Sequence, residues 1–410
     1  MATRKQFALL FLFVFVDVLG FSLILPLLPY YAETFNATPT IVGLLLGANA
    51  VTQLISTPIL GRLSDRYGRR PLLLLSIGGT VISFLLLALA DSLWMLFFSR
   101  ILDGLLGGNV SLAQAYIVDV TDEKNRARGL GLIGASFGLG FIFGPALGGA
   151  LSVGGNYGRP AFVAAGLAAL NLLGVLLWLP ESLSPERRER RARSPQSEFS
   201  VHGLWEALGR PCVGPLLVTQ LLYALSFTTF ETVFSLFAQK QLALEARTTG
   251  YVLTYVGVLV VLVQGGGIGL LTKQFSDKQL VFGGAVLATF SLIGWALTPS
   301  LGVLLAVLAP LALASGVLRV FINSALTKSV LPEEVGGALG LSASLGGLAR
   351  VISPVVGGFL LDNLSPAAPG LASGLLMAGV VYYTWQRVLS VSDVDCPEQS
   401  PGDLLPLTEG

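Results

Sequence analysis

The chain has 410 residues, of which 53% are hydrophobic and only 12% are charged. Such a small number of charged residues cannot cover the surface of a water-soluble protein of this length, and the composition therefore excludes a soluble globular fold. It predicts instead an all-α protein that spans a membrane. The formal net charge of +1 gives no reason to expect a nucleic-acid partner.

Apolar stretches of the length that a transmembrane helix needs, about 20 residues, recur along the whole chain. The first stretch follows Arg4 and Lys5, as in a signal peptide, but it is too long for one and contains Asp17. It is therefore expected to be the first span rather than a removed leader. The twelve expected spans are 7–28, 41–60, 71–90, 93–118, 129–151, 161–179, 211–236, 249–271, 279–298, 302–327, 337–361 and 370–387.

Lysine and arginine are concentrated in alternate loops. If the N-terminus lies inside, most of the 25 lysines and arginines fall in inner segments, above all in residues 61–70 and 181–210. The positive-inside rule then predicts that both termini are cytoplasmic in a multi-pass protein of the cell membrane, either a plasma or an inner membrane. Cys212 and Cys396 would both face the reducing cytoplasm, so a structural disulfide is not expected.

Two segments of the chain are similar enough to indicate a duplicated six-helix unit. Residues 129–149 and 338–358 align without a gap when Pro145 is placed over Pro354. Such a repeat predicts two pseudo-symmetric six-helix bundles related by an axis along the membrane normal, with the substrate site between them at the midplane. The expected division is an N-terminal bundle at 1–180, a cytoplasmic linker at 181–210, a C-terminal bundle at 211–388 and a disordered cytoplasmic tail at 389–410.

The loop between the second and third spans combines two glycines, an acid and several arginines. It reads GRLSDRYGRR over residues 61–70, and its glycines are expected to allow a tight turn. The loop resembles the signature loop of the major facilitator superfamily. The resemblance implies that it latches the cytoplasmic side in the outward-open state; the alternative is that its arginines only fix the topology. The implied gating residues are Gly61, Asp65, Arg66, Gly68, Arg69, Arg70 and, at the end of span four, Asp119.

The fifth span carries a second resemblance, because the spacing of its small residues is similar to the antiporter motif of drug–proton exchangers. Together with Arg100 in span four and Asp17 and Gly20 in span one, it resembles the tetracycline-efflux-like members of the twelve-span drug–proton antiporter branch. The alternative is that these glycines serve only close helix packing. The residues of the motif are Gly131, Gly140, Gly144, Pro145, Gly148 and Gly149.

Six ionisable side chains fall within the expected spans, where each costs about 2.5–3.5 kcal/mol to insert and usually marks a transport pathway. Asp17 and Glu231 are the expected proton carriers, because a low-dielectric site disfavours a charged carboxylate and a cationic substrate can compete with the proton for it. Arg100 is expected either to promote proton release or to form a structural pair with Asp103. Purely structural ion pairs between helices are the alternative for the acids. The six residues are Asp17, Arg100, Asp103, Glu231, Arg319 and Arg350.

Helical periodicity adds uncharged polar residues to this set. Span four, read as one continuous helix, places Gln114 on the side of Arg100 and Asn109 on the opposite side. The family resemblance implies that spans one, four, seven and ten surround a central cavity, with two, five, eight and eleven beside them. The expected proton- and substrate-binding residues are therefore Asp17, Asn49, Gln53, Arg100, Asp103, Gln114, Glu231, Arg319, Asn323 and Arg350.

No phosphate-binding loop, nucleophile–base set or metal-ligand cluster is apparent in the sequence, so the protein is not expected to be an enzyme or to carry a metal or cofactor. The first hypothesis is proton-coupled export, by antiport, of a small amphipathic organic compound by alternating access, with the proton gradient as driving force. The second is a symporter or facilitator for an organic anion or other metabolite, favoured by Arg319 and Arg350. A non-transporting receptor or scaffold is the third. The expected partners are a small molecule, protons and the lipid bilayer, and the protein is expected to be monomeric.

Overall fold

The computed structural model describes residues 4–184, 186, 188–189, 207–210, 212–331 and 334–389, and every regular element in these ranges is helical. Most of the expected linker at 181–210 and the tail from residue 390 lie outside the described residues. The expectation of no disulfide is wrong for Cys212, which is disulfide-bonded. That expectation rested on the compartment in which the protein lies and not on a property of the chain itself.

The N-terminal half consists of helices that begin with clear local signals. Pro39 occupies the first turn of the third helix, and the Thr38 side chain accepts a hydrogen bond from the amide of Ile41. Asp122 caps the seventh helix in the same way, through the amide of Asn125. The helices are α1 (Arg4–Ile24), α2 (Leu28–Glu33), α3 (Pro39–Tyr67), α4 (Arg69–Ala88), α5 (Leu93–Leu106), α6 (Asn109–Val120), α7 (Glu123–Leu151), the 3₁₀ turn η1 (Val153–Gly155) and α8 (Gly158–Trp178).

The C-terminal half repeats this arrangement. Its elements are α11 (Val213–Leu242), α12 (Ala246–Leu262), the π-helical segment η2 (Val263–Gly267), α13 (Ile268–Leu271), α14 (Asp277–Ala296), α15 (Leu301–Lys328), α16 (Val335–Asn363), α17 (Ala368–Thr384) and the π-helical segment η3 (Trp385–Leu389). Within the described ranges, eleven helical segments are long and apolar enough to cross a membrane. The last expected span is α17, which has 17 residues and runs directly into η3. The protein is thus an all-α, multi-pass membrane protein.

Two spans differ from their expected form. Span four is interrupted at Gly107 and Gly108, where the backbone leaves the helical region between α5 and α6. Ser76 of α4 bonds to backbone groups freed by the break, since its hydroxyl accepts from the Gly108 amide at 3.1 Å. The second difference is that α3 continues to Tyr67. Gly61 is therefore helical, so the prediction that it forms part of a tight turn is wrong.

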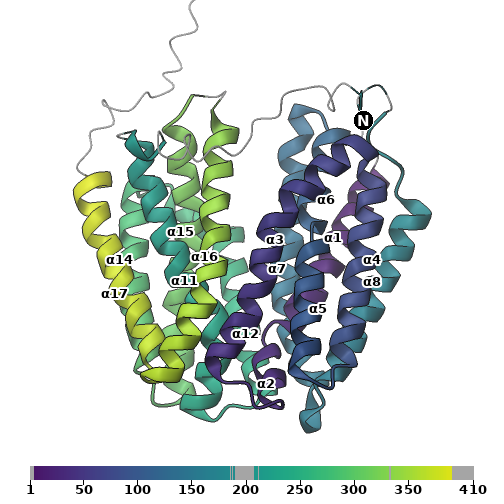
Figure 1. Cartoon of the computed structure of the whole chain (residues 1–410). Coiled ribbons are helices and arrows are strands. Elements are labelled where there is room, and N and C mark those ends of the chain that lie inside the picture. The colour runs from purple at the N-terminus through teal and green to yellow at the C-terminus, as the bar shows by residue number, and fades with distance from the viewer. Residues whose placement is uncertain are drawn as a thin grey trace, which may run out of the picture.

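Figure 1 shows two bundles side by side, with α1–α8 in one and α11–α17 in the other. We call the end that carries residues 61–70 and 181–184 the linker end, and the end that carries α2 the far end. The bundles touch at the far end and diverge towards the linker end (Figure 1). The same helices that meet at the far end are therefore separated at the linker end.

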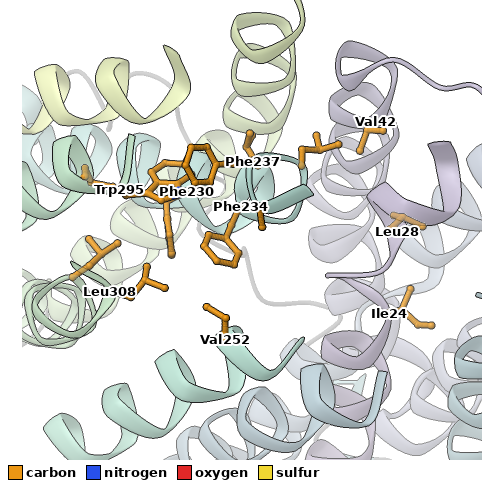
Figure 2. Packing of buried hydrophobic residues seen from close by; sticks show 14 of the residues in the cluster. Ile24, Leu28, Val42, Phe230, Phe234, Phe237, Val252, Trp295 and Leu308 are labelled. Atoms are coloured by element: carbon orange, nitrogen blue, oxygen red, sulfur yellow. The ribbon is translucent and has the colours of Figure 1, made fainter. Parts of the chain in front are cut away.

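The apolar core follows this division. At the far end a single cluster joins Ile24, Leu28 and Val42 of the N-terminal half to Phe230 and Trp295 of the C-terminal half (Figure 2). At the linker end, the core of the described residues is split into separate clusters, one for each half. Among the described residues, a buried apolar cluster that joins the two halves thus stabilises their contact at the far end.

The duplicated segments make equivalent contacts. A Cβ atom added to Gly250 of α12 would meet the carbonyl oxygen of Pro145, and one added to Gly43 of α3 would meet that of Pro354. In each half, a glycine thus packs against the helical turn that contains the proline of the other half, and the absence of a side chain lets the two backbones approach closely. The aligned residues Pro145 and Pro354 occupy matching positions, so the two bundles are pseudo-symmetric in their contacts as well as in their order.

Hydrogen bonds between the halves also lie at the far end. The Tyr30 hydroxyl is 2.6 Å from Thr249 Oγ1, and the Thr254 hydroxyl donates to the carbonyl oxygen of Ile142 at 2.9 Å. The Thr40 hydroxyl donates to Asp362 at 2.7 Å. These bonds join α2, α3 and α7 to α12 and α16, and they reinforce the closed far end.

Candidate functional site

Asp17 lies inside the N-terminal bundle and is held by one amide. The Asn109 Nδ2 atom donates to Asp17 Oδ1 at 2.5 Å and is 3.2 Å from Thr80 Oγ1, while Asn109 Oδ1 is buried without a partner in the described part of the chain. This contact joins α1, α4 and α6. A carboxyl group with a single amide partner can be ionised and accept a hydrogen bond, or be protonated and donate one to an amide oxygen.

Sequence reasoning missed the role of Asn109 because it treated span four as one continuous helix. The break at Gly107–Gly108 changes the direction of every side chain that follows. Asn109, expected on the side of span four opposite Arg100, instead bonds to Asp17 of α1. Gln114, expected on the side of Arg100, is instead exposed on α6, whereas Arg100 is buried in α5. The adjacent glycines were the signal that could have revealed the break.

A second polar group lies between α3, α4 and α5. Arg100 Nη1 is 3.4 Å from Asp103 Oδ2, and Asn49 Nδ2 donates to the same carboxylate oxygen at 3.1 Å. Arg100 Nη2 also lies 3.4 Å from Ser83 Oγ, and the guanidinium lies over the ring of Phe84 at 5.7 Å. Arg100 and Asp103 are only 3% and 9% exposed, so each ionic group depends on the other for its stability.

The face of α3 that was expected to be polar packs on α5. Gln53 Nε2 donates to the Gly107 carbonyl at 3.1 Å, and the Ser56 hydroxyl donates to the Gly104 carbonyl at 2.7 Å. A Cβ atom at Gly104 would meet Thr52 and the Asn49 backbone. In this structure Asn49 and Gln53 therefore connect α3 to α5 within one bundle.

Replacing Asp103 by asparagine is expected to destabilise the protein by about 3–5 kcal/mol, because it leaves the buried Arg100 guanidinium without its counter-charge. The measurement is thermal unfolding of purified protein in detergent. The double variant Arg100→Met, Asp103→Leu removes both charges and is expected to recover most of the loss. If Asp103→Asn unfolds at the wild-type temperature, the pair is not a stabilising contact.

Glu231 lies on α11, on the side that faces the N-terminal bundle. Thr229 and Val233 pack against Gly357 of α16, and at 100° per residue they lie roughly 160° around α11 from Glu231. Phe230 packs edge-on against Trp295 of α14, with centroids 5.0 Å apart. Glu231 thus points away from the contacts that α11 makes with α16 and with Trp295. It is partly exposed, and no hydrogen bond or ion pair to it is found among the described residues.

Arg319 lies on α15, on the side that faces α11 and α12. It is roughly 40° around the helix from Ser315, whose carbonyl accepts from the Tyr223 hydroxyl at 3.2 Å. Arg319 is exposed, although it is placed in the middle of a membrane span.

Arg350 also faces the space between the bundles. It lies within roughly 40° of Pro354, which contacts α3, and of Gly357, which contacts α11. The exposed apolar residues Ile352 and Phe359 are on the opposite side of α16. Asn323 accepts from the Ser342 hydroxyl at 3.1 Å and so connects α15 to α16. The structure thus brings Glu231, Arg319 and Arg350 to the inner side of the C-terminal bundle.

The expected latch residues meet at the linker end. Arg69 Nη2 is 2.6 Å from Asp65 Oδ1, and Arg69 Nε is 2.9 Å from Asp119 Oδ2. Gly68 has φ = 108°, a backbone conformation that favours glycine, and ends α3 there. Arg70 donates to the Leu176 carbonyl at 2.6 Å. All of these contacts lie within the N-terminal half.

Arg66 and Gly61 play no comparable part in this cluster. The Arg66 guanidinium lies over the ring of the adjacent Tyr67 at 5.5 Å. A Cβ atom at Gly61 would find nothing within 4 Å. Among the expected gating residues, the geometry therefore centres on Asp65, Arg69 and Asp119.

Glu181 belongs to the same cluster but was not anticipated. Its carboxylate accepts from the Arg69 amide at 2.9 Å and the Arg70 amide at 3.1 Å, and it is 3.3 Å from Arg188 Nη2. It therefore satisfies backbone donors at the N-terminus of α4, where an anion is favoured. Sequence reasoning assigned this residue to the linker, because the contact joins segments that are far apart in the chain.

Replacing Glu181 by alanine is expected to lower stability by about 1–3 kcal/mol, since buried backbone donors lose their partner. Thermal unfolding of the purified protein measures the loss. Glu186→Gln is the matched control, because Glu186 is exposed nearby and is not bonded to α4. Equal unfolding temperatures for Glu181→Ala and Glu186→Gln would contradict the capping role.

The glycine motif of α7 has two faces. Added Cβ atoms at Gly140, Gly144 and Gly148 would meet Val18, Ser22 and Leu23 of α1, whereas one at Gly149 would meet Arg247 of α12 at 3.0 Å. A Cβ atom added to Gly131 would find no other atom within 4 Å. One face thus packs α7 on the helix that carries Asp17. The other face packs α7 on the opposite half of the molecule at Pro145 and Gly149.

Comparisons with known proteins agree with this fold. The family model of the Major Facilitator Superfamily matches residues 10–278 and 216–400. The chain is 32% identical over 353 residues to the tetracycline resistance protein, class C, of Escherichia coli, which covers 83% of this chain and 86% of that protein. It is 29% identical to solute carrier family 22 member 18 of Mus musculus, over 89% of this chain and 91% of that protein. The crystal structure of the human organic anion transporter MFSD10 (TETRAN) has a TM-score of 0.68 at 24% identity and covers 93% of this chain and 99% of that one, which shows a common fold.

Proposed function

Because the chain belongs to the Major Facilitator Superfamily, a family of secondary transporters, we propose that it exports a small amphipathic organic compound in exchange for protons, by alternating access. The observation that carries the proposal is the position of Glu231. It is an accessible carboxyl group within a membrane span, on the side of α11 that faces the other half. Such a group can bind a proton or a cationic substrate, but not both.

The conformation of the two halves supports alternating access. The far end is closed by apolar packing and by hydrogen bonds such as Tyr30–Thr249, whereas the halves diverge at the linker end. We assign the linker end, and both termini, to the cytoplasm because lysine and arginine are concentrated there. The structure then represents a state open to the cytoplasm, in which substrate enters and displaces a proton.

The reverse half of the cycle requires the latch. Asp65, Arg69 and Asp119 are already bonded to one another within the N-terminal half in the present state. We propose that closure of the linker end adds charge-assisted bonds from this cluster to the C-terminal half, and that these added bonds favour the outward-open state. Once the far end has opened, Glu231 releases the substrate to the outside and takes up a proton from there. Asp17, bonded to Asn109, is proposed as a second proton carrier inside the N-terminal bundle, where the Arg100–Asp103 pair also lies.

The proposed substrate class follows from the relatives and from the residues near Glu231. Relatives at 28–32% identity are named for tetracycline or multidrug resistance, and tetracycline is amphipathic. The Tyr223 and Phe227 rings stack 5.9 Å apart on α11, one to two turns from Glu231. We propose a monomer in a plasma or inner membrane, which is driven by the proton gradient and needs no cofactor.

A second candidate is a symporter or facilitator for an organic anion. It is favoured by Arg319 and Arg350, which are exposed on the inner side of the C-terminal bundle. Guanidinium groups in that position would bind carboxylate or phosphate groups. Right-side-out vesicles separate the two candidates, because a symporter concentrates its substrate inside them and an exporter does not.

Cells provide the first test of the proposal. Cells that express the protein are expected to accumulate less tetracycline than cells that express Glu231→Gln at the same level, and collapse of the proton gradient is expected to remove the difference. Equal accumulation in the two strains would contradict export of this substrate class. Higher accumulation in the wild-type strain would favour the symporter.

A further inference from the structure

A cavity of about 530 Å³ lies at the far end, and both halves line it. Tyr30, Tyr157 and the turn at 152–155 form one wall, and Gln239 and Glu245 of the other half face them. The volume is in the range of small-molecule sites. The cavity lies beyond the far-end contacts of α7 and α12, away from the residues assigned to proton exchange.

One wall of the cavity is aromatic. The rings of Tyr30 and Tyr157 stack with centroids 6.3 Å apart, and Tyr31 lies 5.8 Å from Tyr157. The Tyr30 hydroxyl is already bonded to Thr249 and to the Leu244 carbonyl, so its ring is fixed in place. Such a wall favours an apolar body, and the faces of its rings attract a cation.

The other wall offers hydrogen-bond acceptors. Gln239 donates through Nε2 to Glu33, while its Oε1 atom is buried without a partner in the described part of the chain. Glu33 lies outside the lining, whereas Glu245 is an exposed carboxylate that belongs to it. Arg247, the basic residue of the lining, donates to the Tyr251 hydroxyl at 3.3 Å and lies over the Tyr251 ring. An unpartnered amide oxygen and the Glu245 carboxylate together suit a group that only donates.

We propose that this cavity binds a primary amine with an aromatic body, its ammonium group at Gln239 Oε1 and Glu245 and its rings against Tyr30 and Tyr157. Because the two walls belong to different halves, the bound amine stabilises the closed far end. An amine that binds from the outer side of the membrane therefore slows transport by the protein. This slowing rests on the proposed alternating access, whereas the binding itself does not. The site therefore serves as an inhibitory site for compounds on the far side of the membrane.

Binding is tested on purified full-length protein in detergent, without a proton gradient, by titration with 1-naphthylmethylamine. The neutral analogue 1-naphthalenemethanol has the same ring system but lacks the ammonium group. The amine is expected to bind at least about tenfold more tightly than the alcohol, and Gln239→Leu or Glu245→Gln is expected to weaken it by about tenfold. Gln241→Leu, an exposed neighbour outside the lining, is the matched control and is expected to leave binding unchanged.

Two results would overturn the site. One is equal affinity for the amine and the alcohol. The other is that Glu231→Gln weakens binding of the amine while Glu245→Gln leaves it unchanged. The amine would then occupy the site between the bundles and not the far-end cavity. Failure of proton-driven transport in the wild type would refute the proposed function while leaving the result of this titration unaffected.

Discussion

Glu231→Gln is expected to reduce proton-driven transport by about 100-fold or more, the loss typical of removing a positioned proton-transfer group. Glutamine keeps the size and polarity of the side chain but cannot release a proton. Because Glu231 is partly exposed and forms no hydrogen bond or ion pair with a described residue, the replacement should leave the fold intact. Uptake of tetracycline into inverted vesicles under an imposed pH gradient measures the effect.

Exchange without a gradient separates loss of coupling from loss of folding. Glu231→Gln is expected to retain exchange of labelled for unlabelled tetracycline at equal pH on both sides, since that movement needs no net proton transfer. Wild-type rates of gradient-driven uptake in the variant would remove Glu231 from the mechanism. Asp17 would then be the remaining carboxyl group proposed to carry the proton.

Gly250→Val is expected to shift the protein away from the conformation described here. Its added side chain would meet the Pro145 carbonyl oxygen, so α12 could no longer approach α7 at the far end. Overpacking of this kind costs about 1–3 kcal/mol, which changes the ratio of the two states by about 5- to 150-fold. In Gly250→Val, the transport rate and the accessibility of the inner surfaces from the linker end should therefore both decrease.

A single cysteine at Arg319, which is exposed on the inner side of the C-terminal bundle, reports this exposure through its rate of alkylation from the linker end, in a variant without native cysteines. Gly131→Val is the matched control, because Gly131 lies on the motif helix α7 with open space around it. Alkylation is expected to slow in Gly250→Val and to stay unchanged in Gly131→Val. The packing account fails if the two variants behave alike.

The order of spans could be predicted from sequence because hydropathy is a local property. About 20 apolar residues must form a helix in lipid, where every backbone group needs an internal partner. The equivalence of Pro145 and Pro354 was also visible in the sequence, and the structure confirms it through their contacts with Gly250 and Gly43. Both predictions depend on patterns within single helices.

Contacts between distant segments were harder to predict. The pairing of Asn109 with Asp17 depends on the break at Gly107–Gly108, which a regular 3.6-residue period cannot represent. Glu181 caps α4 across a large separation in sequence, and no local pattern marks that role. The closed far end could not be predicted either, because inward- and outward-facing states use the same helices and the same residues.

The central claim is that substrate and proton compete for the Glu231 carboxyl group between the two bundles. Purified protein in weakly buffered detergent, with a pH indicator present, tests it when saturating tetracycline is added. Proton release on binding is predicted for the wild type, with less release in Glu231→Gln. Binding of tetracycline without any proton release, in a pH range where the wild type transports, would contradict the account.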